Sequence, residues 1–233
     1  MVCHGGCRAG QTLGVTTPRP ARPSHRLAAA ELATRDEVLG SLIEAAGPPR
    51  FRRPSETAFA ALSRSILYQQ LAGPAAAAIH GRLVAAMGDA DDPAALLALS
   101  DETLRGVGLS RNKTLSLRDL AAKVLDGTVD LDRHHLGRAS DAEIVGHLSM
   151  VRGIGEWTAQ MFLMFQLRRL DVWPTRDLGV RRGYGLAWRI PPPTARDLEP
   201  LGDAFRPYRS VAAWYCWRAC ELYAGAADSA LTR

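Results

Sequence analysis

The sequence predicts an all-α protein. Apolar residues recur at the three- and four-residue spacing of a helix, as at Phe59, Leu62 and Ile66. No segment alternates apolar and polar residues in the way that a half-buried strand does. Serine, threonine and aspartate, which favour helix starts, precede most of the apolar segments. At 233 residues, the chain is long enough for one buried core or for two closely packed halves.

The first predicted helices follow from their capping residues. Thr34, ahead of Asp36 and Glu37, is predicted to cap a helix that stops at Gly47. Residues 48–54 are rich in proline and arginine and form a stiff connector. Ser55 is then predicted to begin the helix that carries Phe59, and the next helix starts at Pro74 and stops at Gly88.

The later helices have similar start signals, and the last of them is predicted to run from Tyr208 to Tyr223. An additional helix is expected from Leu178 to Leu186. The other predicted helix starts are Asp92, Ser100, Ser110, Ser140 with Glu143 as a capping box, and Thr194 with Asp197.

Both ends of the chain are predicted to lie outside the folded domain, which then covers residues 31–225. Residues 1–30 are rich in Pro, Gly and Arg and contain no acidic residue, which predicts a disordered basic tail. They also lack the apolar centre of a secretory signal, and no run of about 18 apolar residues predicts a membrane span. Residues 226–233 are small and polar and are predicted to form a C-terminal tail.

The net charge of +5 belongs mainly to the N-terminal tail. Four arginines lie there, at positions 8, 19, 22 and 26, which leaves 25 basic against 24 acidic residues in the rest of the chain. A surface that binds DNA must therefore be a local feature of this protein.

The phrase Arg-Gly-aliphatic-Gly occurs twice, at residues 105–108 and 152–155, a spacing of 47 residues. Two glycines around one apolar residue let the chain reverse between helices while the apolar side chain enters the core. The backbone N–H groups of such a turn face outward and suit an anion such as a DNA phosphate. A purely structural turn is the alternative interpretation.

Asp177 lies 22 positions after Gly155, behind a proline-led turn, and it is a candidate for both structure and chemistry. Its position predicts an N-cap for the helix that begins at Leu178. A capping carboxylate is also a well-oriented carboxylate, so the two roles are compatible.

Three segments together resemble the helix-hairpin-helix (HhH-GPD) superfamily of base-excision DNA glycosylases, specifically its alkylpurine branch, the 3-methyladenine DNA glycosylase II group. They are the Gly153-Ile154-Gly155 hairpin, the turn from Pro174 to Arg182, and the phrase from Arg206 to Ser210. The resemblance covers about residues 55–220. It implies two lobes with an active-site cleft between them. About residues 55–169 form one lobe, a helical barrel, and the early helix together with about residues 170–225 forms the other.

The resemblance assigns the catalytic role to Asp177, which would stabilise positive charge on the sugar as the N-glycosidic bond breaks. Members that also cut the DNA backbone have a lysine two residues after the second glycine. Trp157 occupies that position here, which implies a monofunctional enzyme.

The predicted base pocket contains Trp157, Trp217 and Met161. Two aromatic faces suit a cationic alkylated purine through cation–π contact. Met161 departs from the tyrosine of the best-studied bacterial members, so the range of bases accepted stays open. A core position is the alternative for Trp157.

The predicted DNA contacts lie in two places. Gln70, with neighbours Gln69 and Leu71, matches the loop that fills the gap left by a flipped base, and an ordinary helix end is the alternative. Phosphate contacts are predicted at Gly153, Gly155, Thr158 and Arg209.

No cofactor is expected, apart from a structural monovalent cation that the resemblance implies at the hairpin. Cys3, Cys7, Cys216 and Cys220 form two C-x3-C pairs, but these lack the spacing of the iron–sulfur cluster that some superfamily members carry. Free thiols are therefore predicted, with no metal site.

The sequence thus predicts a monomeric DNA glycosylase that removes 3-methyladenine and 7-methylguanine from double-stranded DNA, in the cytoplasm of a bacterium and associated with the nucleoid. One alternative is a related glycosylase for uracil or for deaminated or oxidised purines. A non-catalytic helix-hairpin-helix DNA-binding protein is the other.

Overall fold

The computed structural model describes residues 23–88, 90 and 92–230, and within these residues it contains helices and no strand. The predicted all-α class is therefore confirmed. No helix in this part of the chain is both long enough and apolar enough to cross a bilayer. In chain order the elements are α1 (His25–Arg35), α2 (Glu37–Ala46), α3 (Ala58–Tyr68), α4 (Gly73–Ala86), α5 (Pro93–Ala98), α6 (Asp101–Gly106), α7 (Arg111–Leu125), α8 (Arg133–Arg138), α9 (Asp141–Ser149), α10 (Glu156–Met161), the π-helix η1 (Phe162–Gln166), α11 (Leu178–Trp188), α12 (Ala195–Leu201), the 3-10 helix η2 (Gly202–Phe205) and α13 (Arg209–Ala230).

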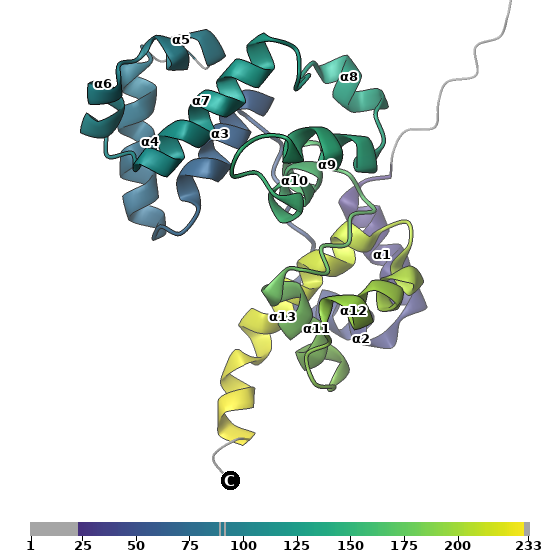
Figure 1. Cartoon of the computed structure of the whole chain (residues 1–233). Helices are drawn as coiled ribbons and strands as arrows, with labels where there is room; N and C mark the ends of the chain where they lie inside the picture. The colour runs from purple at the N-terminus through teal and green to yellow at the C-terminus, as the bar shows by residue number, and fades with distance from the viewer. Residues whose placement is uncertain (1–22, 89, 91, 231–233) are drawn as a thin grey trace, which may run out of the picture.

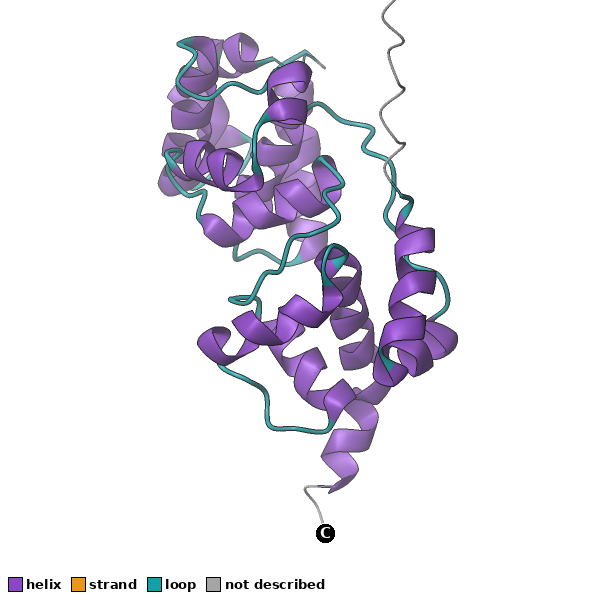
Figure 2. Ribbon diagram, turned by 90° about the vertical axis from the view of Figure 1, so that its right-hand side faces the viewer, coloured by secondary structure: helices purple, strands orange, loops and turns teal. Residues whose placement is uncertain are grey.

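The helices lie in two groups (Figure 1). Helices α3 to α10 form one, which we call the middle group. The terminal group combines α1 and α2 with α11, α12 and α13, and Figure 2 shows the same division after a quarter turn. The chain passes between the groups twice, through residues 47–57 and through residues 167–177. The second passage ends at Asp177.

The terminal group is held together by a close crossing of α11 and α13. A Cβ atom built at Gly183 would lie 1.7 Å from the carbonyl oxygen of Cys216, so only glycine allows the two backbones to approach this closely. Tyr215 on α13 is fully buried, and its hydroxyl donates to the carbonyl of Gly47 at 3.0 Å. The C-terminal helix is thereby joined to the end of α2.

Helix α1 corrects the predicted N-terminal tail. It begins at His25, where Ser24 accepts a hydrogen bond from the backbone of Leu27, so residues 25–30 are helical and belong to the domain. Ala28 and Ala29 are buried in the core, a burial that the polar composition of this end concealed. Residues 1–22 lie outside the described part of the chain.

The capping residue of α2 is Asp36, and the prediction for Thr34 is wrong. Asp36 accepts from the backbone of Leu39 at 2.8 Å, whereas the Thr34 hydroxyl donates to the carbonyl of Glu31 within α1. Both residue types can cap helices, and a threonine hydroxyl inside a helix readily turns back to the preceding turn.

Other helix ends differ by a few residues from the prediction. Thr57, not Ser55, caps α3, and α11 extends to Trp188. At the C-terminus α13 continues to Ala230, so residues 226–230 are helical and the tail predicted there is wrong for them. Alanine is the best helix former, and three alanines in the last turns favour this extension.

His25 predicts a pH dependence of stability. Burial, and then the nearby Arg168 guanidinium, lower the pKa of His25 from 6.5 to about 4. The unfolded chain takes up a proton near pH 6.5, whereas the folded protein resists it. The free energy of unfolding should therefore decrease as the pH falls from 6.5 towards 4. His25 should contribute about 3 kcal/mol to this loss of stability.

Urea denaturation at several pH values measures this decline. His25→Phe keeps a ring against Phe51, whose centroid lies 4.0 Å from that of His25, and removes the titration. The variant should lose most of the slope between pH 6.5 and 4. An unchanged slope would show that other groups cause it.

Candidate active site

Asp177 is the centre of the candidate site. It is only 9% exposed, and three donors point at its carboxylate. Trp157 Nε1 donates to Oδ2 at 2.7 Å, Trp217 Nε1 donates to Oδ1 at 2.9 Å, and the backbone N–H of Val180 donates to Oδ1 at 2.8 Å. The last bond makes Asp177 the N-cap of α11, as the sequence predicts. The carboxylate is therefore fixed in direction and largely removed from water.

The two indoles come from different helix groups. Trp157 lies in the first turn of α10 in the middle group, and Trp217 lies on α13 in the terminal group. Gly179 makes room for Trp217, because a Cβ atom there would lie 2.7 Å from its Cδ1 atom. Position 179, two residues after Asp177, must therefore hold a small residue if the Trp217 indole is to reach the carboxylate.

The passage that leads to Asp177 is anchored by the start of α13. Ser210 accepts from the backbone of Val172 at 2.9 Å and donates to the carbonyl of Arg169 at 2.7 Å. Trp173 Nε1 donates to the carbonyl of Leu198 at 2.9 Å. These bonds position residues 169–173 and hence the turn that presents Asp177.

Arg209 belongs to the same anchor, and its predicted phosphate contact stays a prediction. Its Nε donates to Asp171 Oδ1 at 2.8 Å, and its Nη2 donates to the Asp171 carbonyl at 2.9 Å. The Arg209 side chain is only 12% exposed. A guanidinium held in this way stabilises the passage that leads to Asp177.

A cavity of about 520 Å³ collects most of the residues that the sequence assigns to the base pocket and the wedge. Arg64 and Tyr68, which the sequence interpretation did not assign to the pocket, also line it, with the Arg64 guanidinium 5.9 Å from the Tyr68 ring centroid. Their place on one face of α3 is the signal that could have identified them. The lining residues are Arg64, Ser65, Tyr68, Gln69, Gln70, Trp157, Thr158 and Met161.

The two tryptophans have different surroundings. Trp157 is 45% exposed and lines the cavity, so its ring face is open to a ligand. Trp217 is half-buried, does not line this cavity, and stacks on Phe165 with ring centroids 5.9 Å apart. The structure thus connects Trp217 to the cavity through Asp177. Its direct contact with a base stays a prediction.

The wedge residues are linked to the hairpin. Gln69 Nε2 donates to the carbonyl of Gly153 at 2.8 Å. Gln70, which follows, has a φ of 57°, a left-handed conformation that is costly for a residue with a Cβ atom. It is exposed, as is Leu71. The geometry places Gln70 at the rim of the cavity, and its wedge role stays a prediction.

The hairpin glycines have different structural reasons. Gly153 has a φ of 80°, and a Cβ atom there would lie 2.8 Å from the Ser116 hydroxyl. Gly155 precedes α10 as its N-cap and supplies no side chain to the first N–H groups of that helix. Thr158 is buried in the cavity wall, so a phosphate could reach only its backbone.

Neither lysine lies beside Asp177. Lys113 donates to the carbonyl of Leu67, and burial lowers its pKa. Lys123 donates to Asp119 at 2.7 Å and to the carbonyl of Met150. Both ammonium groups have protein partners away from the carboxylate.

The hairpin carbonyls form the donor set for the implied monovalent cation. The Gly153 carbonyl accepts from Gln69, the Val151 carbonyl accepts from the backbone of Ile154, and the Met150 carbonyl accepts from Lys123. Part of this donor set is therefore used within the chain, and the cation stays a prediction.

In the described part of the chain, no three His, Cys, Asp or Glu residues are grouped as metal ligands. Cys216 and Cys220 are free thiols, and burial raises the pKa of both. Cys3 and Cys7 lie outside the described residues.

Trp217→Phe should lower the rate of any reaction that depends on Asp177 by about tenfold, because it removes one charge-assisted hydrogen bond but keeps a ring against Phe165. Single-turnover assays measure the rate. Trp214→Phe is the matched control, since Trp214 lies on the same helix and does not contact the carboxylate. Equal losses in both variants would assign the effect to packing.

Comparison with known proteins finds similarity along most of the chain. The family model described as HhH-GPD superfamily base excision DNA repair protein matches residues 63–205. DNA-3-methyladenine glycosylase 1 of Schizosaccharomyces pombe is 32% identical over 192 residues, which are 80% of this chain and 84% of that protein.

Two solved structures are similar along most of their length. A DNA-3-methyladenine glycosidase from Bacillus halodurans has a TM-score of 0.78 and 34% identity, covering 85% of this chain and 91% of the other. The 3-methyladenine DNA glycosylase of S. pombe in complex with abasic DNA has a TM-score of 0.73 and 30% identity, covering 84% and 97%.

Proposed function

Because this chain belongs to the HhH-GPD superfamily of base excision DNA repair proteins, we propose that it is a monofunctional DNA glycosylase for alkylated purines. It hydrolyses the N-glycosidic bond of 3-methyladenine and 7-methylguanine and leaves an abasic site. The observation that carries this proposal is the Asp177 carboxylate, buried beside an aromatic cavity and oriented by two indole N–H groups.

The reaction follows from the placement of that carboxylate. The bond between sugar C1′ and the purine nitrogen breaks, and the electron pair leaves with the base. Positive charge then develops on the sugar, where Asp177 stabilises it in a site with little water. A water molecule attacks C1′ and passes its proton to the Asp177 carboxylate, which releases it to solvent, and the hydrolysis is complete. An alkylated purine is already cationic, so it leaves with little help from an acid.

Base selection falls to the cavity. The exposed face of Trp157 attracts a cationic ring more than a neutral one. Met161 lines the same cavity with a flexible apolar side chain, which adapts to bases of different shape. These two residues favour alkylated purines without requiring one particular base.

DNA is held at two points beside the cavity. The N–H groups at Gly153, Gly155 and the start of α10 supply the phosphate contacts. Gln70 enters the duplex and replaces the flipped nucleotide, which offsets part of the cost of unstacking. The duplex covers the face where the two helix groups meet. The protein acts as a monomer on the DNA of the bacterial nucleoid.

The absence of a lysine beside Asp177 supports hydrolysis without strand cleavage. A lyase needs an amine within reach of C1′ to form a Schiff base. Trp157 occupies the position, two residues after Gly155, at which superfamily members that cut the backbone have a lysine. Lys113 and Lys123 have partners elsewhere.

Methylated duplex DNA tests the proposed function. The protein should release 3-methyladenine and 7-methylguanine and leave abasic sites without strand breaks. Binding of duplex DNA without release of any base would identify a non-catalytic DNA-binding protein. Release of uracil or hypoxanthine alone would keep the enzyme class and overturn the proposed substrate.

Glu56→Gln should reduce the preference for cationic bases. Glu56 binds the Arg64 guanidinium, with both carboxylate oxygens within 3.1 Å of Nε, and raises the pKa of that arginine. Glu56 thereby neutralises the Arg64 guanidinium, which lines the cavity that receives the cationic base. Without Glu56, release of 7-methylguanine should fall about fivefold relative to release of neutral hypoxanthine.

The measurement is the ratio of the two release rates on otherwise identical DNA. Arg64→Gln is the matched control, because it removes the positive charge and should change the ratio in the opposite direction. A ratio that moves the same way in both variants would contradict an electrostatic role for this pair.

A further inference from the structure

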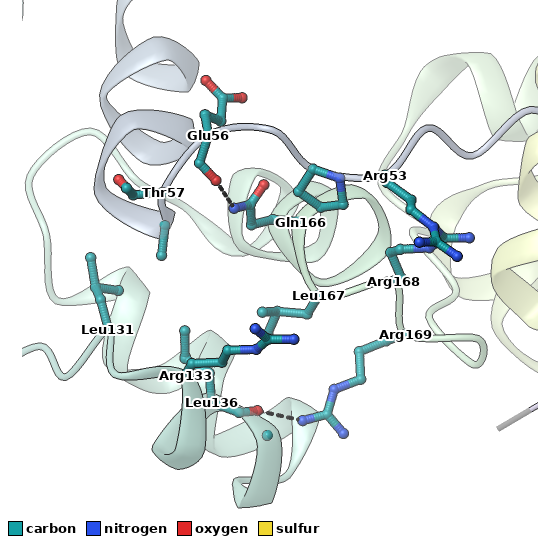
Figure 3. Close-up of a pocket in the computed structure, with 13 residues that line it drawn as sticks. Arg53, Glu56, Thr57, Leu131, Arg133, Leu136, Gln166, Leu167, Arg168 and Arg169 are labelled. Carbon is teal, nitrogen blue, oxygen red and sulfur yellow. Dashed lines mark hydrogen bonds between the residues drawn. The ribbon is translucent and has the colours of Figure 1, made fainter. Parts of the chain in front are cut away.

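A second cavity, of about 780 Å³, opens at the other end of α3 (Figure 3). It lies where the N-terminus of α3, helix α8 and the segment after η1 meet. Its lining shares no residue with the cavity beside Asp177. Helix α3 has 11 residues, so its two ends are about 16 Å apart.

Arginine is the dominant polar residue of this cavity. Arg53, Arg133, Arg168 and Arg169 come from three separate segments. Figure 3 shows Arg53, Arg133 and Arg168 among the side chains that surround this cavity. Several positive charges around one cavity raise the local potential and favour the binding of an anion.

Three of the four guanidinium groups have no acidic partner among the described residues. Arg169 is satisfied, because Nη2 donates to the carbonyls of Leu136 and Ala139 at 2.8 Å and Nε pairs with Asp141. Arg168 contacts only the neutral ring of His25, at 3.2 Å.

Arg53 and Arg133 have neither a hydrogen bond nor an ion pair within the described part of the chain. Glu56 also lines the cavity, but its carboxylate binds Arg64 and points away from the arginines in Figure 3. No carboxylate of the lining therefore neutralises these two groups. The cavity presents three uncompensated positive charges to a ligand.

The lining also contains the polar residues Glu56, Thr57 and Gln166, and three leucines add apolar surface. Leu131, Leu136 and Leu167 form a surface on which a flat ring can pack. Guanidinium forks match phosphate oxygens in geometry and charge. The volume exceeds what one phosphate needs and lies in the range of small-molecule sites.

We propose that this cavity binds a nucleoside phosphate, with the phosphate on Arg53, Arg133 and Arg168 and the base on the leucines. The chain's own N-terminal segment does not suit the cavity, because residues 1–22 contain no acidic residue. The ligand is either a free nucleotide or the phosphorylated end of a DNA strand. This site does not depend on the glycosylase activity.

Fluorescence anisotropy with a labelled ATP measures the binding of a free nucleotide. The full chain should bind the probe at constant ionic strength, and unlabelled ATP should compete at least tenfold better than adenosine. Arg53→Gln with Arg133→Gln should weaken binding at least tenfold. Both side chains lack partners, so the unfolding midpoint of the double variant should match the wild type. Arg196→Gln, an exposed arginine on α12, should bind like the wild type.

A second arm uses a short single-stranded oligonucleotide with and without a 5′-phosphate. Dependence of its affinity on the phosphate and on Arg53 and Arg133 would identify a DNA end as the ligand, whereas dependence for ATP alone would identify a free nucleotide. If neither ligand binds at millimolar concentration, or if the double variant binds both like the wild type, the proposal is wrong.

Discussion

Asp177→Asn should lower the rate of base release about a thousandfold. Asparagine cannot accept with both side-chain atoms, so its amide would meet the N–H of Trp157 or Trp217, and the charge that stabilises the sugar cation is lost. Single-turnover release of 7-methylguanine from methylated duplex DNA measures the effect.

The same variant contains its own control for folding. Asparagine caps helices as well as aspartate does, so the bond from Val180 and the fold should persist. Affinity for a duplex with an abasic-site analogue should also stay near that of the wild type. Base release at the wild-type rate would contradict the catalytic role of Asp177.

Gly183→Ala should reduce the free energy of unfolding by at least about 3 kcal/mol. The new methyl group would lie 1.7 Å from the carbonyl oxygen of Cys216, which is part of a helix backbone and cannot rotate aside. Helices α11 and α13 would have to separate, and Tyr215 and Val180, both buried, would lose contacts. Urea denaturation monitored by circular dichroism measures the change.

Gly81→Ala is the matched control for this substitution. Gly81 lies inside α4, and nothing is within 4 Å of a Cβ atom built there. Alanine at that position should stabilise the protein by about 0.5–1 kcal/mol, since it favours the helix and restricts the unfolded chain. If the two variants are equally stable, the crossing of α11 and α13 is more adaptable than its geometry indicates.

Local patterns predicted much of this structure because helix starts depend on neighbouring residues. Ser110, Ser140 and Thr194 cap helices as expected, and Asp177 caps α11. The failure at Thr34 has the same origin, since threonine and aspartate two residues apart are both suitable caps. Only the packing of α1 decides that Asp36 is used.

The chemistry of the site depended on contacts that no local pattern contains. Asp177 and Trp157 could be found from the hairpin and the turn. That both indoles donate to one carboxylate follows only when α10 and α13 meet. The ion pair of Arg209 could not be predicted either, because its partner Asp171 is 38 positions away.

The two indole hydrogen bonds also make Asp177 a point of contact between the two helix groups. One indole N–H arrives from the middle group and the other from the terminal group, and both end on the same carboxylate. If the groups moved apart, the bond from Trp157 to Oδ2 would break, while Trp217 and Val180, both in the terminal group, would still bind Oδ1. The arrangement with three donors on one carboxylate therefore exists only while the groups are docked. Asp177 thus takes part both in the candidate site and in the contact between the two helix groups.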